Sequence, residues 1–340
     1  MGATMEPYCD AIVLAGDRRD SHTVFGENKA FLEIEGVPLL AHVLAALDRA
    51  PSIRRAFVVG DPARLREVLG QATHRGLRIE VAIVSQQEDL WGNFWAAYVH
   101  TLSPATRDRI AAGEKPEEAA TPKERDRRVL ALSGDIPLVQ SAEIEAFLAD
   151  AVLSGADYAA GLTSEESLEA FYPTRDRPGI RMAYFQLREG RFRQNNLHFA
   201  RPLRVDHRER IERMYRHRYQ RNLADAVRLA LAILRTRVVG LSTVWGFVLL
   251  HLAMKLDLAG RRRASDFLRR FLPASRVEQS ISRMLGGDFR LIRVPSPGAA
   301  LDVDRESDFE VLRARFGEWR EICARRAPGP SSVAAVSWRG

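Results

Sequence analysis

Short apolar runs alternate with amphipathic stretches along the first 150 residues of the chain. The apolar runs are those expected of strands that lie buried in a sheet, and they occur at 11–15, 56–59, 79–84 and 129–133. The stretches between them place apolar side chains at helical spacing, which predicts helices at 37–47, 62–69, 93–102 and 141–152. Such alternation is typical of a parallel sheet covered by helices on both faces, so we expect an α/β fold.

The pattern is less regular in later parts of the chain. Further strands are predicted at 158–161, 180–187, 289–294 and 301–304. Residues 104–128 are charged and rich in alanine and show no apolar face, so we expect an exposed, partly disordered excursion. Ser307 and Glu310 have the spacing of a capping box, which predicts a closing helix that runs through Trp319.

The segment 205–287 is expected to be helical. Apolar residues recur with a 3.6-residue period from Ile211 to Leu234, and the glycines at 286–287 are a natural helix stop. Residues 238–254 carry no formal charge, but a bilayer span takes roughly 20 apolar residues, so a buried or groove-forming helix is the better interpretation. A helix that lies on a membrane surface is the alternative, which leaves a peripheral membrane contact open. The predicted units are a core at 8–204 and 288–322, a helical insertion lobe at 205–287 and a flexible tail at 323–340.

The composition narrows the choice of partners. A hydrophobic content of 46% and a charged content of 28% are ordinary for a globular protein. The net charge of +7 suits phosphate-rich ligands, nucleic acid or an anionic membrane surface without choosing among them. Cys9 and Cys323 form neither a metal-binding spacing nor a disulfide framework, and the first ten residues do not have the pattern of a signal peptide. We therefore expect a cytoplasmic protein.

The first predicted strand leads directly into a loop that suits phosphate binding. Gly16 follows the strand, and a polar stretch then reaches Lys29. Backbone N–H groups in such a loop can face phosphates, and Arg18, Arg19 and Lys29 would neutralise a triphosphate. The loop lacks both the G-x-G-x-x-G and the G-x-x-x-x-G-K-[ST] pattern, so neither a dinucleotide site nor a P-loop is indicated.

Acidic residues follow two other predicted strands. Asp135 comes after the strand at 129–133, at the edge where parallel α/β sheets bind ligands. A carboxylate there suits Mg²⁺ beside substrate phosphates, although an isolated G-D-x-P can also be only a turn. Asp302 and Asp304 would share one face of the strand at 301–304, or they could simply be acids at the start of a helix.

These motifs, taken in their order, resemble the NTP-transferase superfamily. The resemblance rests on the LAG loop, the lysine in NKAFL, the GVPLLAHVL helix, SGDIPL and LDVDRESDFEVL, and it covers about 10–200 and 289–316. The branch that it resembles is the molybdopterin-guanylyltransferase-like NTP transferases, which are related to sugar-phosphate nucleotidyltransferases. The resemblance implies a Rossmann-like three-layer fold with a mostly parallel sheet.

The resemblance also implies a role for each matching residue. Arg18 and Arg19 would hold the triphosphate, and Lys29 would stabilise the transition state of phosphoryl transfer. Asp135 would be the principal ligand of Mg²⁺, or of Mn²⁺ in its place, with Asp304 rather than Asp302 as the second ligand. The nucleotide would be bound by Leu14, Ala15, Gly16, Gln86, Asn93 and Gly134, and the acceptor or the ribose by Asn195 and Asn196.

Two features depart from the family pattern. The loop reads LAGD where LAGG is usual, so Asp17 brings a carboxylate to the expected triphosphate site. The segment 205–287 has no counterpart in the minimal fold, and its arginine-rich part contains Arg218 and Arg221. These arginines would face a phosphorylated acceptor if the lobe covers that side of the site; otherwise they would face solvent while the lobe forms a homodimer interface.

The function predicted from these residues is a Mg²⁺-dependent nucleotidyltransferase. It would transfer a nucleoside monophosphate from an NTP, with CTP and GTP as first candidates, to a small phosphorylated acceptor and release pyrophosphate. One alternative is a glycosyltransferase that uses a nucleotide sugar on the same core. Another is a non-catalytic nucleotide-binding protein, which Asp17 suggests. Nucleic-acid binding is disfavoured, because a long helix with one apolar face normally solvates its other face with charge.

Overall fold

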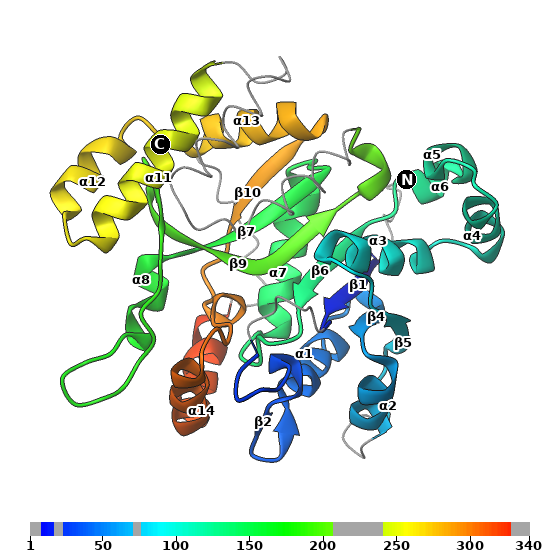
Figure 1. Cartoon of the computed structure of the whole chain (residues 1–340), viewed down its shortest axis with the longest axis horizontal. Helices are drawn as coiled ribbons and strands as arrows, with labels where there is room; N and C mark the ends of the chain where they lie inside the picture. Colours follow the sequence, from blue (N-terminus) through cyan, green and yellow to red (C-terminus); the bar gives the residue numbers. More distant parts are fainter. Residues whose placement is uncertain (1–7, 17–22, 71–75, 207–240, 328–340) are drawn as a thin grey trace, which may run out of the picture.

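The centre of the molecule is a mixed eight-stranded sheet (Figure 1). The computed structural model of the protein describes residues 8–16, 23–70, 76–206 and 241–327. The strand order is β10-β7-β9-β6-β1-β4-β5, and β8 pairs with β9. All ladders are parallel except those of β9, which is antiparallel to its neighbours β6, β7 and β8. The strands are β1 Cys9–Leu14, β4 Ile53–Gly60, β5 Glu80–Ser85, β6 Val129–Ser133, β7 Tyr158–Ser164, β8 Phe185–Leu187, β9 Gly190–Ala200 and β10 Phe289–Arg293.

Helices cover both faces of this sheet, and the three-layer Rossmann-like prediction is confirmed. Ala11 and Val13 of β1 belong to a cluster with α1 (Leu39–Asp48), α2 (Pro62–Gly70) and α7 (Ser141–Leu153). Ile12 points to the other face and packs in a cluster with α3 (Leu90–Thr101). Successive side chains of a strand alternate between faces, so one apolar run is buried by both helix layers. Helix α3 begins three residues before its predicted start because the Asp89 side chain accepts a hydrogen bond from the Gly92 N–H at 2.7 Å.

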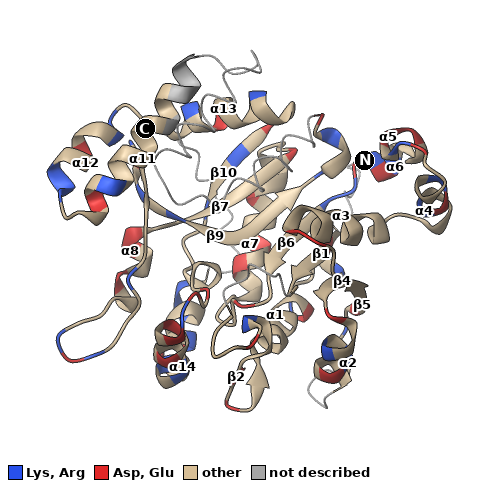
Figure 2. Cartoon of the chain, in the orientation of Figure 1, with Lys and Arg blue, Asp and Glu red and all other residues tan. Residues whose placement is uncertain are grey.

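The prediction of a partly disordered excursion at 104–128 is wrong. The segment forms three short helices, α4 (Pro104–Ala111), α5 (Pro116–Ala119) and α6 (Pro122–Arg125), which carry charges of both signs (Figure 2). Glu124 holds them together from a buried position. Its carboxylate accepts hydrogen bonds from the Ser103 N–H at 2.8 Å, from the Thr106 hydroxyl at 2.9 Å and from the Thr121 N–H at 3.0 Å. This polar network orders the segment together with the burial of Ala119 and Ala120.

Replacing Glu124 with alanine should loosen the segment. Burial opposes ionisation of Glu124, but the hydrogen bonds from Ser103, Thr121 and Thr106 outweigh it and lower the pKa to about 2. Glu124→Ala leaves those donors unpaired, so we expect a loss of about 2 kcal/mol in the free energy of unfolding and faster proteolysis between 104 and 128. Glu118→Ala is the control, because that exposed side chain makes only a 3.8 Å ion pair with Lys115. Equal resistance of the two variants to protease and urea would show that the network is not what orders the segment.

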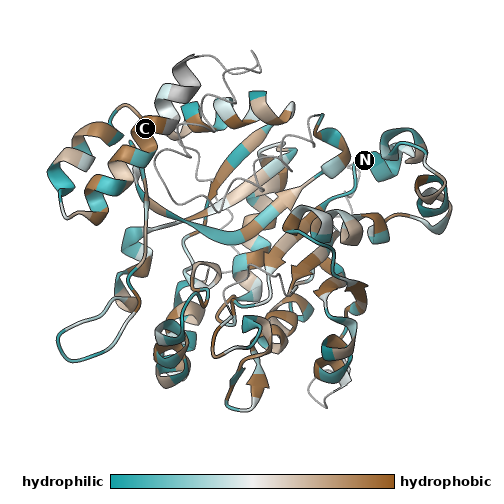
Figure 3. Ribbon diagram, in the orientation of Figure 1, coloured by the Kyte–Doolittle hydropathy of each residue, from teal (hydrophilic) through white to brown (hydrophobic). Residues whose placement is uncertain are grey.

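The described part of 205–287 consists of helices α11 (Leu241–Leu258), α12 (Arg262–Arg269) and α13 (Ala274–Leu285). They cover the half of the sheet that α3 leaves free, and Ala274 and Leu285 share an apolar cluster with Leu162, Phe192 and Leu291. Hydrophobic and hydrophilic positions both occur along these helices (Figure 3). The predicted arginine-rich helix at 211–234 lies outside the described residues. None of the helices in the described ranges is long and apolar enough to cross a membrane.

The C-terminal region corrects several further predictions. Residues 301–304 follow a short 3₁₀ helix (Gly298–Ala300) and form no strand: Leu301 and Val303 are buried in alternation with the two aspartates, but no neighbouring strand pairs with them. In the region predicted as a strand at 180–187, only β8 forms a strand. Ile180 and Tyr184 are instead buried in an apolar cluster that includes residues of α14 (Glu306–Arg326). The N-cap of α14 is Arg305, whose side chain makes no capping hydrogen bond, so the predicted capping box is absent.

Helix α14 continues beyond its predicted end at Trp319. It buries Cys323, which is therefore not part of a flexible tail.

A buried glutamate ties this C-terminal region to the core. Glu143 lies in the first turn of α7 and accepts a hydrogen bond from the Ala299 N–H at 3.0 Å. Gly298 must be glycine here, because a Cβ atom would lie 2.3 Å from the Leu138 carbonyl oxygen. Burial disfavours the charged form of Glu143, and it raises the pKa of the group to about 8. The segment that carries Asp302 and Asp304 is thereby fixed against the end of β6.

Glu143 should also make the stability of the protein depend on pH. Between pH 4.5 and about pH 8 the unfolded protein ionises this glutamate while the folded protein keeps it protonated, so the free energy of unfolding falls as the pH rises. Glu143→Gln keeps the acceptor oxygen and removes the titration. We expect urea denaturation to show a smaller loss of stability between pH 5 and pH 8 in the variant than in the wild type. Identical slopes would mean that Glu143 is ionised in the folded protein.

Candidate functional site

The register of the parallel strands brings the predicted nucleotide-binding residues to one edge of the sheet. Leu14 at the end of β1 is opposite Val59 of β4 and Ser133 of β6, and Gly60 is opposite Ser85 of β5. The residues that follow these strand ends therefore meet. This is the edge at which open α/β sheets bind ligands.

Gly16 lies against two polar side chains at this edge. A Cβ atom on Gly16 would lie 3.0 Å from Asn93 Nδ2 and 3.1 Å from Gln86 Oε1, so the three residues are in close proximity. Asn93 is buried at the start of α3, where its side-chain oxygen accepts a hydrogen bond from the Gln87 N–H. The absence of a side chain at position 16 leaves the strand end open beside two amide groups. Amides of this kind can recognise the edge of a nucleobase.

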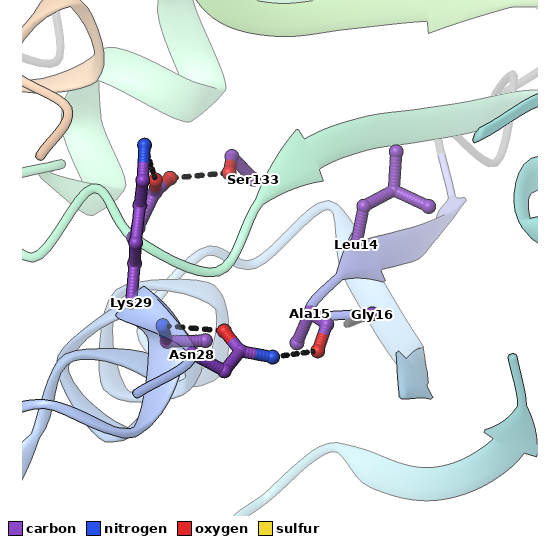
Figure 4. Close-up of a pocket in the computed structure, with 8 residues that line it drawn as sticks. Leu14, Ala15, Gly16, Asn28, Lys29 and Ser133 are labelled. Atoms are coloured by element: carbon purple, nitrogen blue, oxygen red, sulfur yellow. Dashed lines mark hydrogen bonds and ion pairs between the residues drawn. The ribbon is translucent and has the colours of Figure 1, made fainter. Parts of the chain in front are cut away.

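Next to Gly16 is a small pocket of about 90 Å³ (Figure 4). Asn28 shapes it: its Nδ2 donates a hydrogen bond to the Ala15 carbonyl at 2.8 Å, and its Oδ1 accepts one from the Ala30 N–H at 2.9 Å. These bonds hold the short 3₁₀ helix Lys29–Phe31 against the end of β1. The pocket is lined by Leu14, Ala15, Gly16, Asn28, Lys29, Ala30, Ser133 and Asp135.

Lys29 is the centre of a charged network on the wall of this pocket. Its Nζ lies 3.9 Å from the Asp135 carboxylate and 3.2 Å from that of Asp304. Arg193 extends the network, with its guanidinium 2.6 Å from Asp302 and 3.9 Å from Asp304. Asp135 thus meets the distant pair Asp302 and Asp304 around two cations.

The surroundings of Asp135 disfavour its negative charge. Burial and the negative charge of Asp302 raise the pKa of Asp135 to about 6, while Lys29 and a hydrogen bond from the Ser133 hydroxyl oppose the shift. Three carboxylates against two basic groups leave an excess of negative charge at this point. A bound cation would relieve it.

The carboxylate oxygens also suit a particular kind of cation. Among the described residues, no three His, Cys, Asp or Glu side chains are grouped so as to hold a metal by themselves. Mg²⁺ needs only one or two carboxylates, because waters and substrate phosphates complete its coordination. Asp135 and Asp304 both contact Lys29, whereas Asp302 is engaged by Arg193. The carboxylates of Asp135 and Asp304 are of the kind that Mg²⁺ or Mn²⁺ takes, and their role as metal ligands stays a prediction.

Other predicted site residues make contacts within the protein. Asn195 is buried, donates to the Thr163 hydroxyl at 3.2 Å and accepts from the Leu197 N–H at 3.1 Å. Asn196 donates to the Ala299 carbonyl at 3.1 Å. Their contact with an acceptor stays a prediction, as does nucleotide binding by Gly134, whose N–H donates to the Leu14 carbonyl at 3.0 Å. The remaining predicted positions, Asp17, Arg18, Arg19, Arg218 and Arg221, lie outside the described residues.

The sequence did not single out Asn28, Ser133 or Arg193. Asn28 and Ser133 could have been found, because each is next to, or two positions from, a predicted site residue. Arg193 likewise lies two positions from Asn195, but its pairing could not be predicted, since its partner Asp302 is 109 positions away. Only the fold brings this pair together.

The mostly parallel sheet, with its polar pocket at the carboxyl ends of β1 and β6, defines a nucleotide-binding α/β protein. The chain belongs to the family of the MobA-like NTP transferase domain, whose model matches residues 11–229. The resemblance stated from the motifs is thereby confirmed, and the family is one of nucleotidyltransferases. No curated protein matches the sequence.

Several solved structures are similar to this chain. A hypothetical transferase from Thermus thermophilus is 25% identical, with a TM-score of 0.56, over 88% of this chain and 99% of its own. 4-Diphosphocytidyl-2C-methyl-D-erythritol synthase from Anaerococcus prevotii is 10% identical, with a TM-score of 0.44, over 92% and 99%. CMP:2-keto-3-deoxy-manno-octonic acid synthetase, complexed with CTP, is 13% identical, with a TM-score of 0.42, over 91% and 99%. At these two lower scores, neither synthetase bears on the substrate of this chain.

Proposed function

We propose that the protein transfers a nucleoside monophosphate from an NTP to a small phosphorylated acceptor and releases pyrophosphate. The observation that supports this most directly is the position of Lys29. Its ammonium group lies between Asp135 and Asp304 on the wall of the pocket at the end of β1. A cation beside two carboxylates and a strand-end loop is suited to a reaction in which negative charge builds up on a departing phosphate group.

In the proposed reaction, an oxygen of the acceptor phosphate attacks the α-phosphorus of the NTP in line. The bond from the α-phosphorus to the bridging oxygen breaks, and pyrophosphate leaves with its electron pair. No side-chain nucleophile is required, so the protein contributes position and charge. Lys29 would neutralise the charge that develops on the leaving pyrophosphate, and Arg18 and Arg19 would hold the triphosphate.

The acidic residues would complete the site. Asp135 and Asp304 are the residues that would hold Mg²⁺ or Mn²⁺, which when bound neutralises phosphate charge and helps to orient the triphosphate. Arg193 keeps Asp302 engaged at 2.6 Å and so leaves the more exposed Asp304 facing Lys29. On the opposite side of Gly16, Gln86 and Asn93 would contact the base, for which CTP and GTP are the first candidates.

A release assay tests this proposal. Each of the four NTPs is mixed with a pool of phosphorylated metabolites and the protein, with and without Mg²⁺, and pyrophosphate is measured. We expect pyrophosphate with one preferred NTP, and only when Mg²⁺ and the acceptor pool are both present. Release of a nucleoside diphosphate from nucleotide sugars would favour the glycosyltransferase instead. Tight NTP binding without any turnover would favour a non-catalytic nucleotide-binding protein.

A further inference from the structure

Large apolar side chains are exposed mainly on one part of the protein. Among the described residues, nine large hydrophobic side chains are exposed, and six of them lie between 245 and 271, on α11 and α12 or next to these helices. The six are Trp245, Val248, Leu252, Leu258, Phe267 and Phe271. Isolated apolar residues are normal on a protein surface, but a concentration of this kind marks an interaction site.

The geometry of the two helices explains why these side chains point outward. Trp245, Val248 and Leu252 follow the i, i+3, i+7 spacing of one helix face, while Leu249 and Ala253 on the adjoining side of the helix are buried. The Ser265 hydroxyl donates to the Ala253 carbonyl at 2.8 Å and so fixes α12 against that inner face. The two helices thus have one buried side and one exposed side in the tertiary structure. The sequence of 238–254 does not indicate this, because it has no charged residues that would mark the exposed side.

The exposed apolar residues on α12 and just after its end are aromatic. Phe267 lies on α12 and Phe271 in the turn that follows the helix, with ring centroids 5.6 Å apart in an edge-to-face arrangement. They are 56% and 49% exposed. Arg263 and Arg270 lie on the same side of the helix by their spacing, and both are exposed. Aromatic and basic side chains therefore alternate on one surface.

The charges of this region are sorted by sign. The acids Asp257 and Asp266 turn inward to Arg191 of β9, at 3.6 Å and 2.9 Å, and the Arg191 side chain is only 15% exposed. The Asp257 side chain is 12% exposed and that of Asp266 is 40% exposed, and the other exposed charges around the apolar side chains are basic, namely Lys255, Arg261, Arg263 and Arg270. These ion pairs hold the two helices on the sheet, and α12 carries both basic and acidic residues (Figure 2).

We propose that this surface of α11 and α12 docks on an anionic membrane surface. Trp, Phe and Leu beside Arg and Lys is the composition of helices that lie in the membrane interface, and each basic residue is attracted by anionic lipid. A second copy of the chain fits less well, because a symmetric contact through this surface would bring its arginines against those of the partner. The surface lies at the end of the molecule opposite α4–α6 (Figure 1). The proposal does not depend on the identity of the transferred nucleotide.

Vesicle sedimentation of the full chain tests the proposal. We expect co-sedimentation with phosphatidylcholine vesicles that contain phosphatidylglycerol, and much less with phosphatidylcholine alone. Arg263→Gln and Arg270→Gln should each lower the partition constant about fivefold, because each removes one charge from the interface. Phe267→Ser combined with Phe271→Ser should lower it by about tenfold or more. Leu153→Ser is the matched control, since Leu153 is 67% exposed but lies on α7, and it should bind like the wild type.

A second measurement locates the contact on the protein. Brominated phosphatidylglycerol should quench tryptophan fluorescence in the wild type, and Trp245→Phe should lose most of that quenching. All of these side chains are exposed, so circular dichroism should show that the variants are folded. The proposal is overturned if the wild type binds neither kind of vesicle or binds both equally. It is also overturned if the double variant Phe267→Ser with Phe271→Ser binds as the control does. A dimer interface is indicated instead, and the proposal is overturned, if none of the proteins binds vesicles and light scattering shows a dimer that only the double variant Phe267→Ser with Phe271→Ser loses.

Discussion

Replacing Asp135 with alanine is expected to lower kcat/KM for nucleotidyl transfer by about 10²–10³-fold, the effect of removing one preorganised charged group from a transition state. The fold should survive. Asp135 follows the end of β6 and is buried beside two other aspartates, so its charge costs free energy in the folded protein. Thermal unfolding should therefore occur at the same temperature as in the wild type or slightly above it, while steady-state kinetics measures the lost turnover.

Asp302→Asn is the matched control for this variant. Asp302 lies in the same cluster, but its carboxylate is engaged by Arg193 at 2.6 Å rather than by Lys29. If Asp135 and Asp304 form the metal site, Asp302→Asn should retain most of its activity, and Asp304→Asn should resemble Asp135→Ala. Full activity of Asp135→Ala at subsaturating Mg²⁺ would show that the G-D-x-P sequence forms only a turn and that Asp135 is not a metal ligand. A severe defect in Asp302→Asn together with an active Asp304→Asn would reverse the assignment of the second ligand.

Lys29→Met is expected to lower kcat by about 10²-fold while changing the affinity for NTP only a few-fold. The ammonium group lies 3.2 Å from Asp304 and 3.9 Å from Asp135, so in the free protein its charge is already partly compensated. It gains most when negative charge develops on the departing pyrophosphate, and an interaction that is stronger in the transition state than in the ground state raises kcat. Single-turnover kinetics with a separate measurement of NTP binding distinguishes the two effects.

Two companion variants define the role of Lys29. Lys29→Arg keeps the charge and should recover part of the rate, whereas Lys123→Met removes an exposed lysine from α6 and should have no effect. If Lys29→Met loses NTP affinity and kcat/KM to the same extent while kcat is unchanged, Lys29 is a binding residue only. The proposed part of Lys29 in transition-state stabilisation would then be wrong.

The layout of the site could be predicted from the sequence because it depends on strand ends. Buried strands of a parallel sheet are continuous apolar runs, so the ends of β1 and β6 are visible as the points where apolar residues give way to Gly16 and Asp135. All carboxyl ends of parallel strands meet at one edge, which brings such residues together without further information. The meeting of Gly16 and Asp135 at one pocket follows from this, whereas Lys29 is held there by the hydrogen bonds of Asn28.

The tertiary structure decided what depends on pairing between distant polar groups. Glu124 orders 104–128 by accepting hydrogen bonds from Ser103 and Thr106. Arg193 pairs with Asp302, which is 109 positions away. Arg191 forms ion pairs with Asp257 of α11 and Asp266 of α12. Residues 301–304 alternate between buried and exposed as a strand would, yet no neighbour pairs with them. Local apolar periodicity records which side of a segment is buried. The partner of a charged or hydrogen-bonding group has no periodic pattern in the sequence, because the two groups come together only when the chain folds.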